Sequence, residues 1–325
     1  MDFSDRMNIY KEEINDQLQS LFEKKKPEIL YEPMKYAINI GGKRVRPILC
    51  GIFFRLFGGD PARVLYPALA IELLHNFTLV HDDIMDDDDL RRGNKTVHVK
   101  WDLSTGVLSG DGIVSLAYKV LLKEKFERSD EIIRIFTDGL LEVCEGQAYD
   151  KEFETRTDVT EEEYLEMINN KTAALLAVPA AVGALCAGAG DEQVETARDY
   201  GRALGLAFQI QDDLLDIAGD EALFGKTYGS DVAEGKKTYL YILAVKLMSR
   251  QDLGVFMSIA GKEGITRDEI LQVKKLYDKY GIIEKAGEEA AKYIKKAESL
   301  IGSLDNELDC SELKQFTEWM LKRKF

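Results

Sequence analysis

The sequence predicts an all-α protein. Apolar residues recur at helical spacing in one run after another, and no stretch of any length alternates with the period of two expected of a β-strand. Only six prolines interrupt these runs, and no Ser/Gly-rich or low-complexity linker divides the 325 residues. We therefore expect a single helical domain over residues 1–325.

The net charge and the cysteines indicate which binding partners and which cellular compartment to expect. A formal net charge of −15 argues against nucleic acid and against an anionic membrane surface, so clustered basic residues are expected to meet a small anionic ligand. The N-terminus lacks the pattern of a signal peptide. The four cysteines show no close metal or redox spacing and fit a reducing cytoplasm: Cys50, Cys144, Cys186 and Cys310.

The segment from Thr172 to Gly190 carries no charge and is nearly long enough to span a bilayer. It consists mostly of Ala and Gly, is broken by Pro179, and contains few strongly hydrophobic residues. We expect it to pack inside a soluble protein, with no integral membrane segment in the chain.

Two helices are expected at the N-terminus. Residues 4–25 have amphipathic spacing and good helix formers, and the run stops before Pro27. The second helix, Tyr31 to Ile40, is closed by Gly41-Gly42. We assign the first helix no chemistry.

A basic cluster follows the glycine pair. Lys43, Arg44 and Arg46 stand between Gly41-Gly42 and the apolar run from Ile48 to Phe57. Glycine lets backbone N–H groups approach an anion, and the next helix N-terminus adds partial positive charge, so the cluster could cradle a diphosphate. Basic residues at a helix start are also commonly solvated, and this segment alone does not decide between the two.

The helix from Pro67 to Asp86 carries an acidic motif. Asp82 and Asp86 are four residues apart, about 40° around an ideal helix, so both carboxylates can point at one site, with Asp83 beside them. Crowded carboxylates raise one another's pKa unless a cation neutralises them, and an all-oxygen site favours magnesium over zinc. His75 shares this helix face and is either a functional group or a satisfied core residue.

Arg91 and Arg92 follow the acidic run where this helix should end. They can pair with Asp87 to Asp89 or face an incoming diphosphate, for which the forked guanidinium is well suited. An acidic run seen alone is most often a solvated helix end. A metal site therefore needs a second observation.

Further helical stretches occupy the middle of the chain. Ser109 to Gly112 interrupts the pattern before a helix from Ile113 to Phe126, and another apolar stretch begins at Ile132. A Thr-x-x-Glu capping box at Thr160 starts a helix that runs to Lys171-Thr172.

The helix from Glu192 to Ile217 repeats the acidic spacing. Gln209 precedes Asp212, Asp213 and Asp216, which again form Asp-Asp-x-x-Asp on an apolar helix. Two copies, each ending a helix that looks buried, are hard to explain as two solvated faces. We interpret them as two walls of one metal site.

A polar, glycine-rich stretch from Ala218 to Lys237 has the character of a mobile lid. Its lysines, Lys226 and Lys236 among them, could close over an anion, although a solvated loop of mixed charge is an equally good description. From Thr238 onward the amphipathic helices are expected to be structural.

Together these residues resemble the trans-isoprenyl diphosphate synthases, which include farnesyl and geranylgeranyl diphosphate synthases. The resemblance spans Gly41 to about Tyr239. It rests on ordered motifs, namely Gly-Gly-Lys-Arg-x-Arg-Pro, both aspartate-rich motifs, Arg-Arg-Gly after the first of them, Gly-Gln at 146 and 147, Lys171-Thr172 and the lid lysines.

The resemblance implies an isoprenoid-synthase-type bundle of about ten core helices around a central cavity, in a homodimer. It implies a prenyltransferase that uses roughly two to three magnesium ions. The implied catalytic residues are Asp82, Asp83, Asp86, Lys171, Asp212 and Asp213. Magnesium would be bound by Asp82, Asp86 and Asp212, with support from Asp83, Asp213 and Asp216. Allylic diphosphate would be held by Arg91, Lys171, Thr172, Gln209, Lys226 and Lys236, and isopentenyl diphosphate by Lys43, Arg46, His75 and Arg92.

In the implied reaction, diphosphate leaves an allylic carbon and the double bond of isopentenyl diphosphate attacks the resulting cation. A proton is then lost to the departing diphosphate, so no Ser, Cys or His nucleophile is required. Two positions depart from the family pattern. Lys95 and Leu240 stand where proline is usual, which puts the loop geometry near Arg92 and Lys236 in doubt.

Product length is expected to depend on two residues of the first acidic helix. In the family, bulky side chains at the fourth and fifth positions before the motif set the cavity floor, and here these are Thr78 and Phe77. The chain resembles archaeal geranylgeranyl diphosphate synthases, with farnesyl or somewhat longer diphosphates as alternatives. An ideal helix places Thr78 beneath Asp82 but turns Phe77 about 140° away, so Phe77 could also be plain core packing.

Three other functions remain open. A class I terpene cyclase also uses an aspartate-rich metal site but needs no isopentenyl diphosphate pocket, so Lys43, Arg46 and Arg92 argue against it. A non-catalytic subunit of a heteromeric synthase is expected to have lost an acidic motif, and both are intact here. A non-enzymatic metal-binding protein would leave the lysines without a role.

Overall fold

The computed structural model describes residues 2–23, 25–60, 63–218, 229–304 and 307–321. Across these ranges the chain is almost entirely helical, and its only strands are β1 (Leu90–Arg91) and β2 (Asn94–Lys95), which pair antiparallel. The all-α prediction is confirmed. The strands of this hairpin are two residues long each, too short to produce a period-two pattern in the sequence.

The helices follow one another with short connections. The first part of the chain forms α1 (Phe3–Ser20), α2 (Glu28–Asn39), α3 (Val45–Leu56), α4 (Leu65–Met85), α5 (Val97–Lys100), α6 (Leu103–Leu121) and α7 (Ser129–Thr155). The next part forms α8 (Glu161–Ile168), the π-helical turn η2 (Asn169–Ala173), α9 (Ala174–Cys186) and α10 (Asp191–Ala218). The last part forms α12 (Ser230–Glu234), α13 (Tyr239–Leu247), α14 (Arg250–Ile259), α15 (Arg267–Lys279), α16 (Ile282–Ser303) and α17 (Ser311–Leu321).

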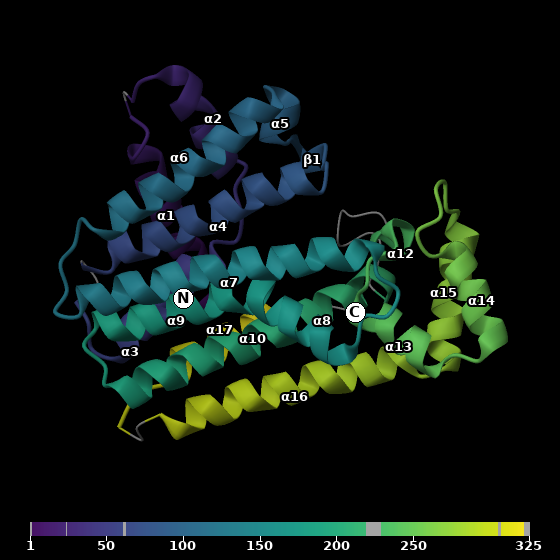
Figure 1. Cartoon of the computed structure of the whole chain (residues 1–325). Helices are drawn as coiled ribbons and strands as arrows, with labels where there is room; N and C mark the ends of the chain where they lie inside the picture. Colours follow the sequence, from purple (N-terminus) through teal and green to yellow (C-terminus); the bar gives the residue numbers. More distant parts are fainter. Residues whose placement is uncertain (1, 24, 61–62, 219–228, 305–306, 322–325) are drawn as a thin grey trace.

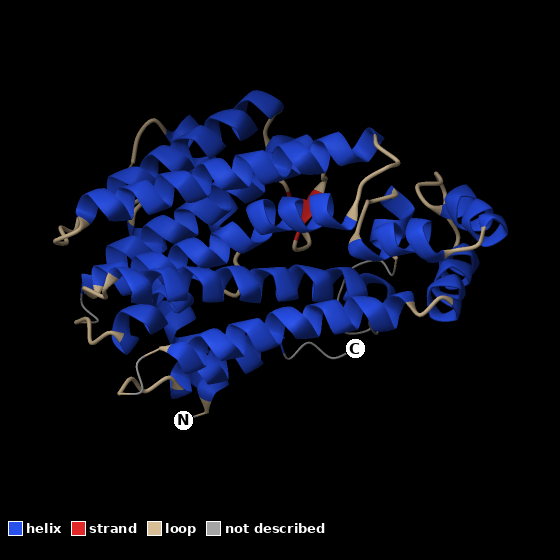
Figure 2. Cartoon of the chain, turned by 60° about the horizontal axis from the view of Figure 1, so that its bottom comes forward, coloured by secondary structure: helices blue, strands red, loops and turns tan. Residues whose placement is uncertain are grey.

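Long helices run side by side through the molecule (Figures 1 and 2), with α9 packed between α7, α3 and α10, and α10 against α16. One hydrophobic cluster is built mainly by α1 to α7, α9, the start of α10 and α17, and a second by α8, the end of α10 and α12 to α16. The helix α10 belongs to both clusters, through Tyr200 in the first and Ile210 in the second. The first acidic motif ends a helix of the first cluster, and the second acidic motif lies on α10 within the second cluster. Whether these clusters form one domain stays a prediction.

The helix α6 runs without a break through Ser109 to Gly112, where the sequence predicted an interruption. The glycines serve packing instead, because a Cβ on Gly110 would lie 2.1 Å from Nε2 of His81 on α4. The predicted start at Ile113 is therefore wrong, and the helix begins ten residues earlier, at Leu103. The predicted end at Phe126 is also wrong, since α6 stops at Leu121.

Pro179 lies inside α9 and does not break it. Every residue from Ala174 to Cys186 is buried, so contacts with neighbouring helices hold the helix although proline lacks one backbone donor. The close packing is visible at Gly183, where a Cβ would lie 2.3 Å from the carbonyl oxygen of Cys50. Among the helices that the structure describes, none combines the length and the apolar character needed to cross a membrane.

Candidate active site

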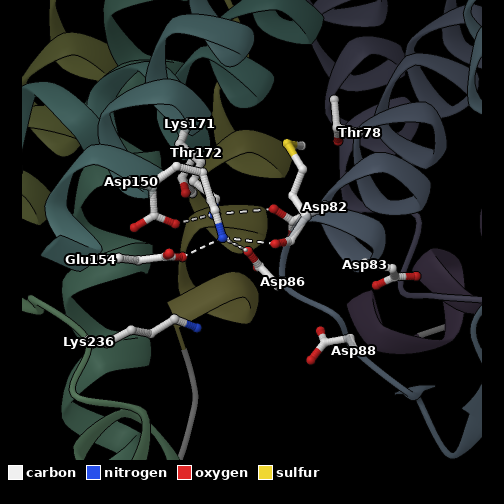
Figure 3. Close-up of polar contacts among 12 residues, drawn as sticks. Thr78, Asp82, Asp83, Asp86, Asp88, Asp150, Glu154, Lys171, Thr172 and Lys236 are labelled. Atoms are coloured by element: carbon white, nitrogen blue, oxygen red, sulfur yellow. Dashed lines mark hydrogen bonds and ion pairs between the residues drawn. The ribbon is translucent and has the colours of Figure 1, made fainter. Parts of the chain in front are cut away.

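The first acidic motif lies at the C-terminal end of α4. Asp82 occupies the last turn, and Asp86 follows the helix, with its N–H donating to the carbonyl of Asp82 at 2.9 Å. Nζ of Lys171 lies 3.3 Å from Oδ1 of Asp82, and Asp86 is close by (Figure 3). Burial and the neighbouring charge of Asp82 raise the pKa of Asp86. Asp82 and Asp86 thus share one side of α4, as their spacing predicts.

Lys171 belongs to η2, the π-helical turn between α8 and α9. Its ammonium donates to Oδ2 of Asp150 on α7 at 2.5 Å. Burial lowers the pKa of Lys171, but the attraction of Asp82 and Asp150 outweighs burial and raises it. Gly146 allows this contact between α7 and η2, because a Cβ there would lie 2.2 Å from the backbone nitrogen of Lys171. The sequence predicted a plain helix here and missed the π-helical turn, which often marks a functional site.

The helix α7 supplies two site residues that the sequence analysis missed, Asp150 and Lys151. Asp150 pairs with Lys171, and Nζ of Lys151 lies 3.7 Å from Asp86 while donating to the last carbonyl of α4 at 2.8 Å. Gln147, Asp150, Lys151 and Glu154 recur at helical spacing and make a polar stripe on one face of α7. That stripe is the sequence signal that could have found them.

Asp83, the middle carboxylate of the first motif, is turned away from Lys171 (Figure 3). It is 4% exposed and accepts a hydrogen bond from Nε of Arg91 at 2.6 Å, and Arg91 also lies 3.2 Å from Asp88. Burial raises the pKa of Asp83 to about 6, although Arg91 acts in the opposite direction. Of the two options predicted for Arg91, the structure shows pairing with the acids of its own segment.

Arg92 lies at the turn of the β1–β2 hairpin. Its φ of 53° and that of Gly93, 76°, match a type I′ turn, which requires positive φ at both central residues. The Arg92 guanidinium rests against Gly42, where a Cβ would lie 2.7 Å from Nη1. Lys95, a position where the family usually has proline, lies in β2, and its carbonyl accepts a hydrogen bond from Tyr36 at 2.7 Å. The hairpin is thereby tied to α2.

Arg46 and His75 form a basic cluster with Arg92. Nη1 of Arg46 lies 3.2 Å from Nε2 of His75. Burial and the charges of Arg46 and Arg92 hold the pKa of His75 well below its ordinary value, so the ring is neutral near pH 7 and can accept from Arg46. Nε of Arg46 is buried without a protein partner, which leaves a donor for an anion. His75 therefore belongs to this basic cluster, and its sharing of a helix face with the metal-binding acids stays a prediction.

Arg44 is separate from this basic cluster. It forms a buried ion pair with Glu72 at 2.5 Å, with side chains 2% and 3% exposed, and its Nε donates to Asn15 at 2.8 Å. The sequence grouped Lys43, Arg44 and Arg46 as one anion cradle. The structure turns Arg44 inward, directs Arg46 to His75 and leaves Lys43 on the surface. Arg44 therefore has a structural role.

The second motif is organised differently. Asp213 is buried and accepts hydrogen bonds from the Tyr164 hydroxyl (2.5 Å), Nε2 of Gln209 (3.0 Å) and the backbone N–H of Tyr239 (3.2 Å). Gln209 in turn accepts from the hydroxyl of Thr172 at 2.9 Å. Burial raises the pKa of Asp213 despite these donors. Tyr164 was not identified from the sequence, where no pattern marks it.

The carboxylate of Asp216 is hydrogen-bonded to the first residues of α12. It accepts from the N–H and hydroxyl of Ser230 and from the N–H of Asp231. Lys236 follows α12, and Figure 3 shows its ammonium on the same side of the site as Asp150 and Glu154. Lys226 lies outside the described residues.

The carboxylates are suitable ligands for magnesium, although they do not form a complete coordination site on their own. Across the ranges described by the structure, no three His, Cys, Asp or Glu side chains lie close enough to hold a metal ion. Magnesium is usually bound by one or two carboxylates together with water and substrate phosphates, which suits Asp82, Asp86 and the half-buried Asp212. In this structure the ammonium groups of Lys171 and Lys151 lie beside Asp82 and Asp86, as expected where carboxylates are crowded together.

The family model for polyprenyl synthetase matches residues 27–278. The chain belongs to the polyprenyl synthetase family. It is 39% identical to the geranylgeranyl diphosphate synthase of Sulfolobus acidocaldarius over 328 aligned positions, with 99% of each chain covered. It is 42% identical to the geranylfarnesyl diphosphate synthase of Natronomonas pharaonis over 259 positions, covering 74% of this chain and 75% of that relative. The crystal structure of geranylgeranyl pyrophosphate synthetase from Pyrococcus horikoshii has a TM-score of 0.93 at 37% identity, with 99% of this chain and 98% of that chain covered.

The two residues expected to set product length point in different directions in this polyprenyl synthetase. Phe77 packs edge-on against His81, with ring centroids 4.8 Å apart, and His81 lies 3.2 Å from the carbonyl of Val107 on α6. Thr78 donates to the carbonyl of His75 at 2.8 Å and lies farther up α4 than Asp82 (Figure 3). This divergence is the one that the ideal helix predicts. The role of both residues in product length stays a prediction.

Proposed function

We propose that this polyprenyl synthetase condenses isopentenyl diphosphate with an allylic diphosphate in a magnesium-dependent reaction. The observation that carries the proposal is the presence of two separate cationic groups beside α4. Lys171 lies among carboxylates at the end of α4, while Arg46 contacts His75 and the charge of Arg92 acts on the same ring. Two cationic groups suit two diphosphate substrates.

The allylic diphosphate is proposed to lie beside Asp82, Asp86 and Lys171. Magnesium held by Asp82, Asp86 and Asp212, in roughly two to three ions, would supply neutralisation of the charge that develops on the leaving diphosphate. Lys171 keeps its proton because Asp82 and Asp150 raise its pKa, so it adds a fixed positive charge. The Thr172–Gln209–Asp213 hydrogen bonds fix the side chains next to it. The further residues proposed to contact this diphosphate are Arg91, Lys226 and Lys236.

Isopentenyl diphosphate is proposed to bind at the basic cluster. Arg46 and Arg92 supply forked donors, and the neutral ring of His75 accepts from Arg46 and so orients its guanidinium. Lys43 adds a surface charge at the same loop. The double bond then attacks the allylic cation, and the departing diphosphate takes the proton. No side-chain nucleophile is needed for this step.

The proposed product is geranylgeranyl diphosphate, in line with the relatives from S. acidocaldarius and P. horikoshii. The relative from N. pharaonis is named for a geranylfarnesyl product, so a longer chain is the second candidate. Phe77→Ser is expected to lengthen the product if the aromatic ring forms the cavity floor. Unchanged product length on chromatography would assign Phe77 to core packing against His81 alone.

We propose that two copies of the chain form a dimer through α6. Exposed large apolar side chains gather there and just before it, at Trp101, Leu103, Val107 and Leu108. Light scattering should show a dimer for the native chain and a monomer for a Val107→Glu/Leu108→Glu variant.

All four cysteines are free of disulfide bonds, which suits the cytoplasm that we propose as the location of the protein.

The central experiment incubates the purified protein with magnesium, labelled isopentenyl diphosphate and each of dimethylallyl, geranyl and farnesyl diphosphate, and then sizes the products. Elongation that depends on an allylic primer and stops with a chelator supports the proposal. A terpene cyclase would instead convert an allylic diphosphate without isopentenyl diphosphate. No elongation with any primer would reject the proposed activity.

A further inference from the structure

We propose that Asp216 is a positioning residue that fixes α12 and thereby places Lys236 at the first acidic motif. The inference rests on the proposed function, since it gives Lys236 a role at that site. The aspartate-rich spacing by itself groups Asp216 with the metal-binding acids. The contacts of its carboxylate favour a different role.

Both carboxylate oxygens of Asp216 receive donors from the first residues of α12. Oδ1 accepts from the N–H of Ser230 at 3.1 Å and from its hydroxyl at 2.6 Å, and Oδ2 accepts from the N–H of Asp231 at 3.0 Å. The carbonyl of Asp216 also accepts from the N–H of Gly229 at 2.9 Å. These bonds tie the end of α10 to three consecutive residues, so Asp216 defines where α12 begins.

The short helix α12 transmits this constraint. The N–H of Lys236 donates to the carbonyl of Asp231 at 3.0 Å, which links the lysine to the residue that Asp216 holds. At the other end, Gly235 packs against Gly261, where a Cβ on Gly235 would lie 2.9 Å from the Cα of Gly261. The N–H of Gly261 also donates to the carbonyl of Val232 at 2.9 Å. With both ends held, α12 places Lys236 as part of one small rigid unit.

Lys236 points from this unit toward the candidate site. Figure 3 shows its ammonium below Asp86, Asp150 and Glu154. Lys236 interacts electrostatically with both Asp86 and Asp150. Lys236 also pairs with Glu234 of α12 at 3.2 Å, with about half of its side chain exposed. The lysine is therefore near enough to the acidic group for its position to matter.

Steady-state kinetics on full-length variants tests the role. Asp216→Asn is expected to raise the KM for the allylic diphosphate and to lower kcat, together by about tenfold to a hundredfold, as expected for a misplaced charge. The magnesium concentration for half-maximal rate, measured at saturating substrate, should stay unchanged. Ser230→Ala should act in the same direction by about fivefold, because it removes one hydrogen bond to Asp216.

Two controls separate positioning from metal binding and from a general loss of fold. Asp212→Asn should raise the half-saturating magnesium concentration, as expected for a ligand. Ser258→Ala also removes a serine hydroxyl, but one that donates to a backbone carbonyl on the exposed face of α14, and it should leave the kinetics unchanged. If Asp216→Asn raised the magnesium requirement as Asp212→Asn does, the positioning role would be rejected.

The double variant Asp216→Asn/Lys236→Ala tests whether the two residues act as one unit. Its loss should match that of Lys236→Ala within about twofold, whereas additive losses would reject the proposal. Hydrogen exchange of the substrate-free protein gives a readout that needs no activity. Residues 229–236 should exchange faster in Asp216→Asn while α4 keeps its protection, and unchanged exchange would also reject the proposal. An inactive native protein would reject the proposed function but would leave this exchange result valid.

Discussion

The two acidic motifs have the same Asp-Asp-x-x-Asp spacing, but they meet different neighbours. On α4, Asp82 and Asp86 both lie beside lysines of other helices and remain accessible. On α10, Asp213 is buried under Tyr164, and Asp216 is occupied by the start of α12. Equal spacing therefore sets how the carboxylates are arranged on their own helix, and the surrounding elements decide which of them stay available.

The difference follows from where each motif lies. The first motif ends α4, and the chain then turns into the β1–β2 hairpin, whose Arg91 pairs closely with Asp83 and Asp88 and lies 3.9 Å from Asp82. Both middle carboxylates are buried, but Asp83 is covered by Arg91 of the hairpin, whereas Asp213 lies within the second hydrophobic cluster against α8 and α13. A buried carboxylate needs donors, and Asp213 receives three from its surroundings.

The largest expected effect comes from the accessible acids of the first motif. Asp82→Asn should lower kcat by about a hundredfold to a thousandfold, the usual cost of removing one preorganised charge-stabilising group, and should raise the magnesium requirement. Turnover measured against magnesium concentration checks this. The control is Asp87→Asn, which removes a charge from an exposed residue at φ 54° that Asn also adopts. Equal losses would mean that only the total charge of the segment matters.

The position of Lys171 relative to the first motif can be changed without altering any charged residue. Gly146→Ala would force α7 and η2 apart, because the new Cβ would lie 2.2 Å from the backbone of Lys171. A displacement of about 1 Å is expected to cost roughly a hundredfold in kcat/KM. Gly254→Ala on α14, where a Cβ meets nothing within 4 Å, is the matched control and should leave turnover unchanged. Native turnover in Gly146→Ala would show that this close contact does not set the position of Lys171.

Replacing the middle aspartate of each motif should lower the free energy of unfolding by different amounts. Asp213→Ala leaves the buried hydroxyl of Tyr164 without its acceptor and should lower the free energy of unfolding by about 1–3 kcal/mol. Asp83→Ala should lower the free energy of unfolding by less. Arg91 is only half-buried, so it can still donate to Asp88, 3.2 Å away, and to water. Urea denaturation midpoints compare the two. Equal destabilisation would contradict the different surroundings inferred for the two buried aspartates.

The smallest expected effect isolates one hydrogen bond of the enclosed motif. Tyr164→Phe removes the hydroxyl that donates to Asp213 and should lower the free energy of unfolding by about 1 kcal/mol. Tyr118→Phe, whose hydroxyl bonds Thr137 at an exposed position, should be close to neutral in the same urea titration. A neutral Tyr164→Phe would mean that Gln209 and the backbone of Tyr239 are enough to satisfy Asp213.

Much of the candidate site could be predicted because it depends on spacing within single helices. The capping box at Thr160 is confirmed, and the predicted helix Pro67–Asp86 corresponds to α4, Leu65–Met85. Asp82 and Asp86 fall on one side of α4 because residues four apart are neighbours on any α-helix. The predicted break at Ser109 to Gly112 was wrong because glycine was interpreted from local propensity, whereas its use here is close packing against α4.

By itself, the sequence determined the all-α class, the two acidic motifs and the resemblance to the synthase family, because periodicity and motif order are local properties of the chain. Only the tertiary structure decided that Arg44 pairs with Glu72 while Arg46 meets His75, and that Asp150 pairs with Lys171. These choices depend on which helices pack together and how closely they approach. Residues far apart in the chain set that approach, and no spacing within one helix can specify it.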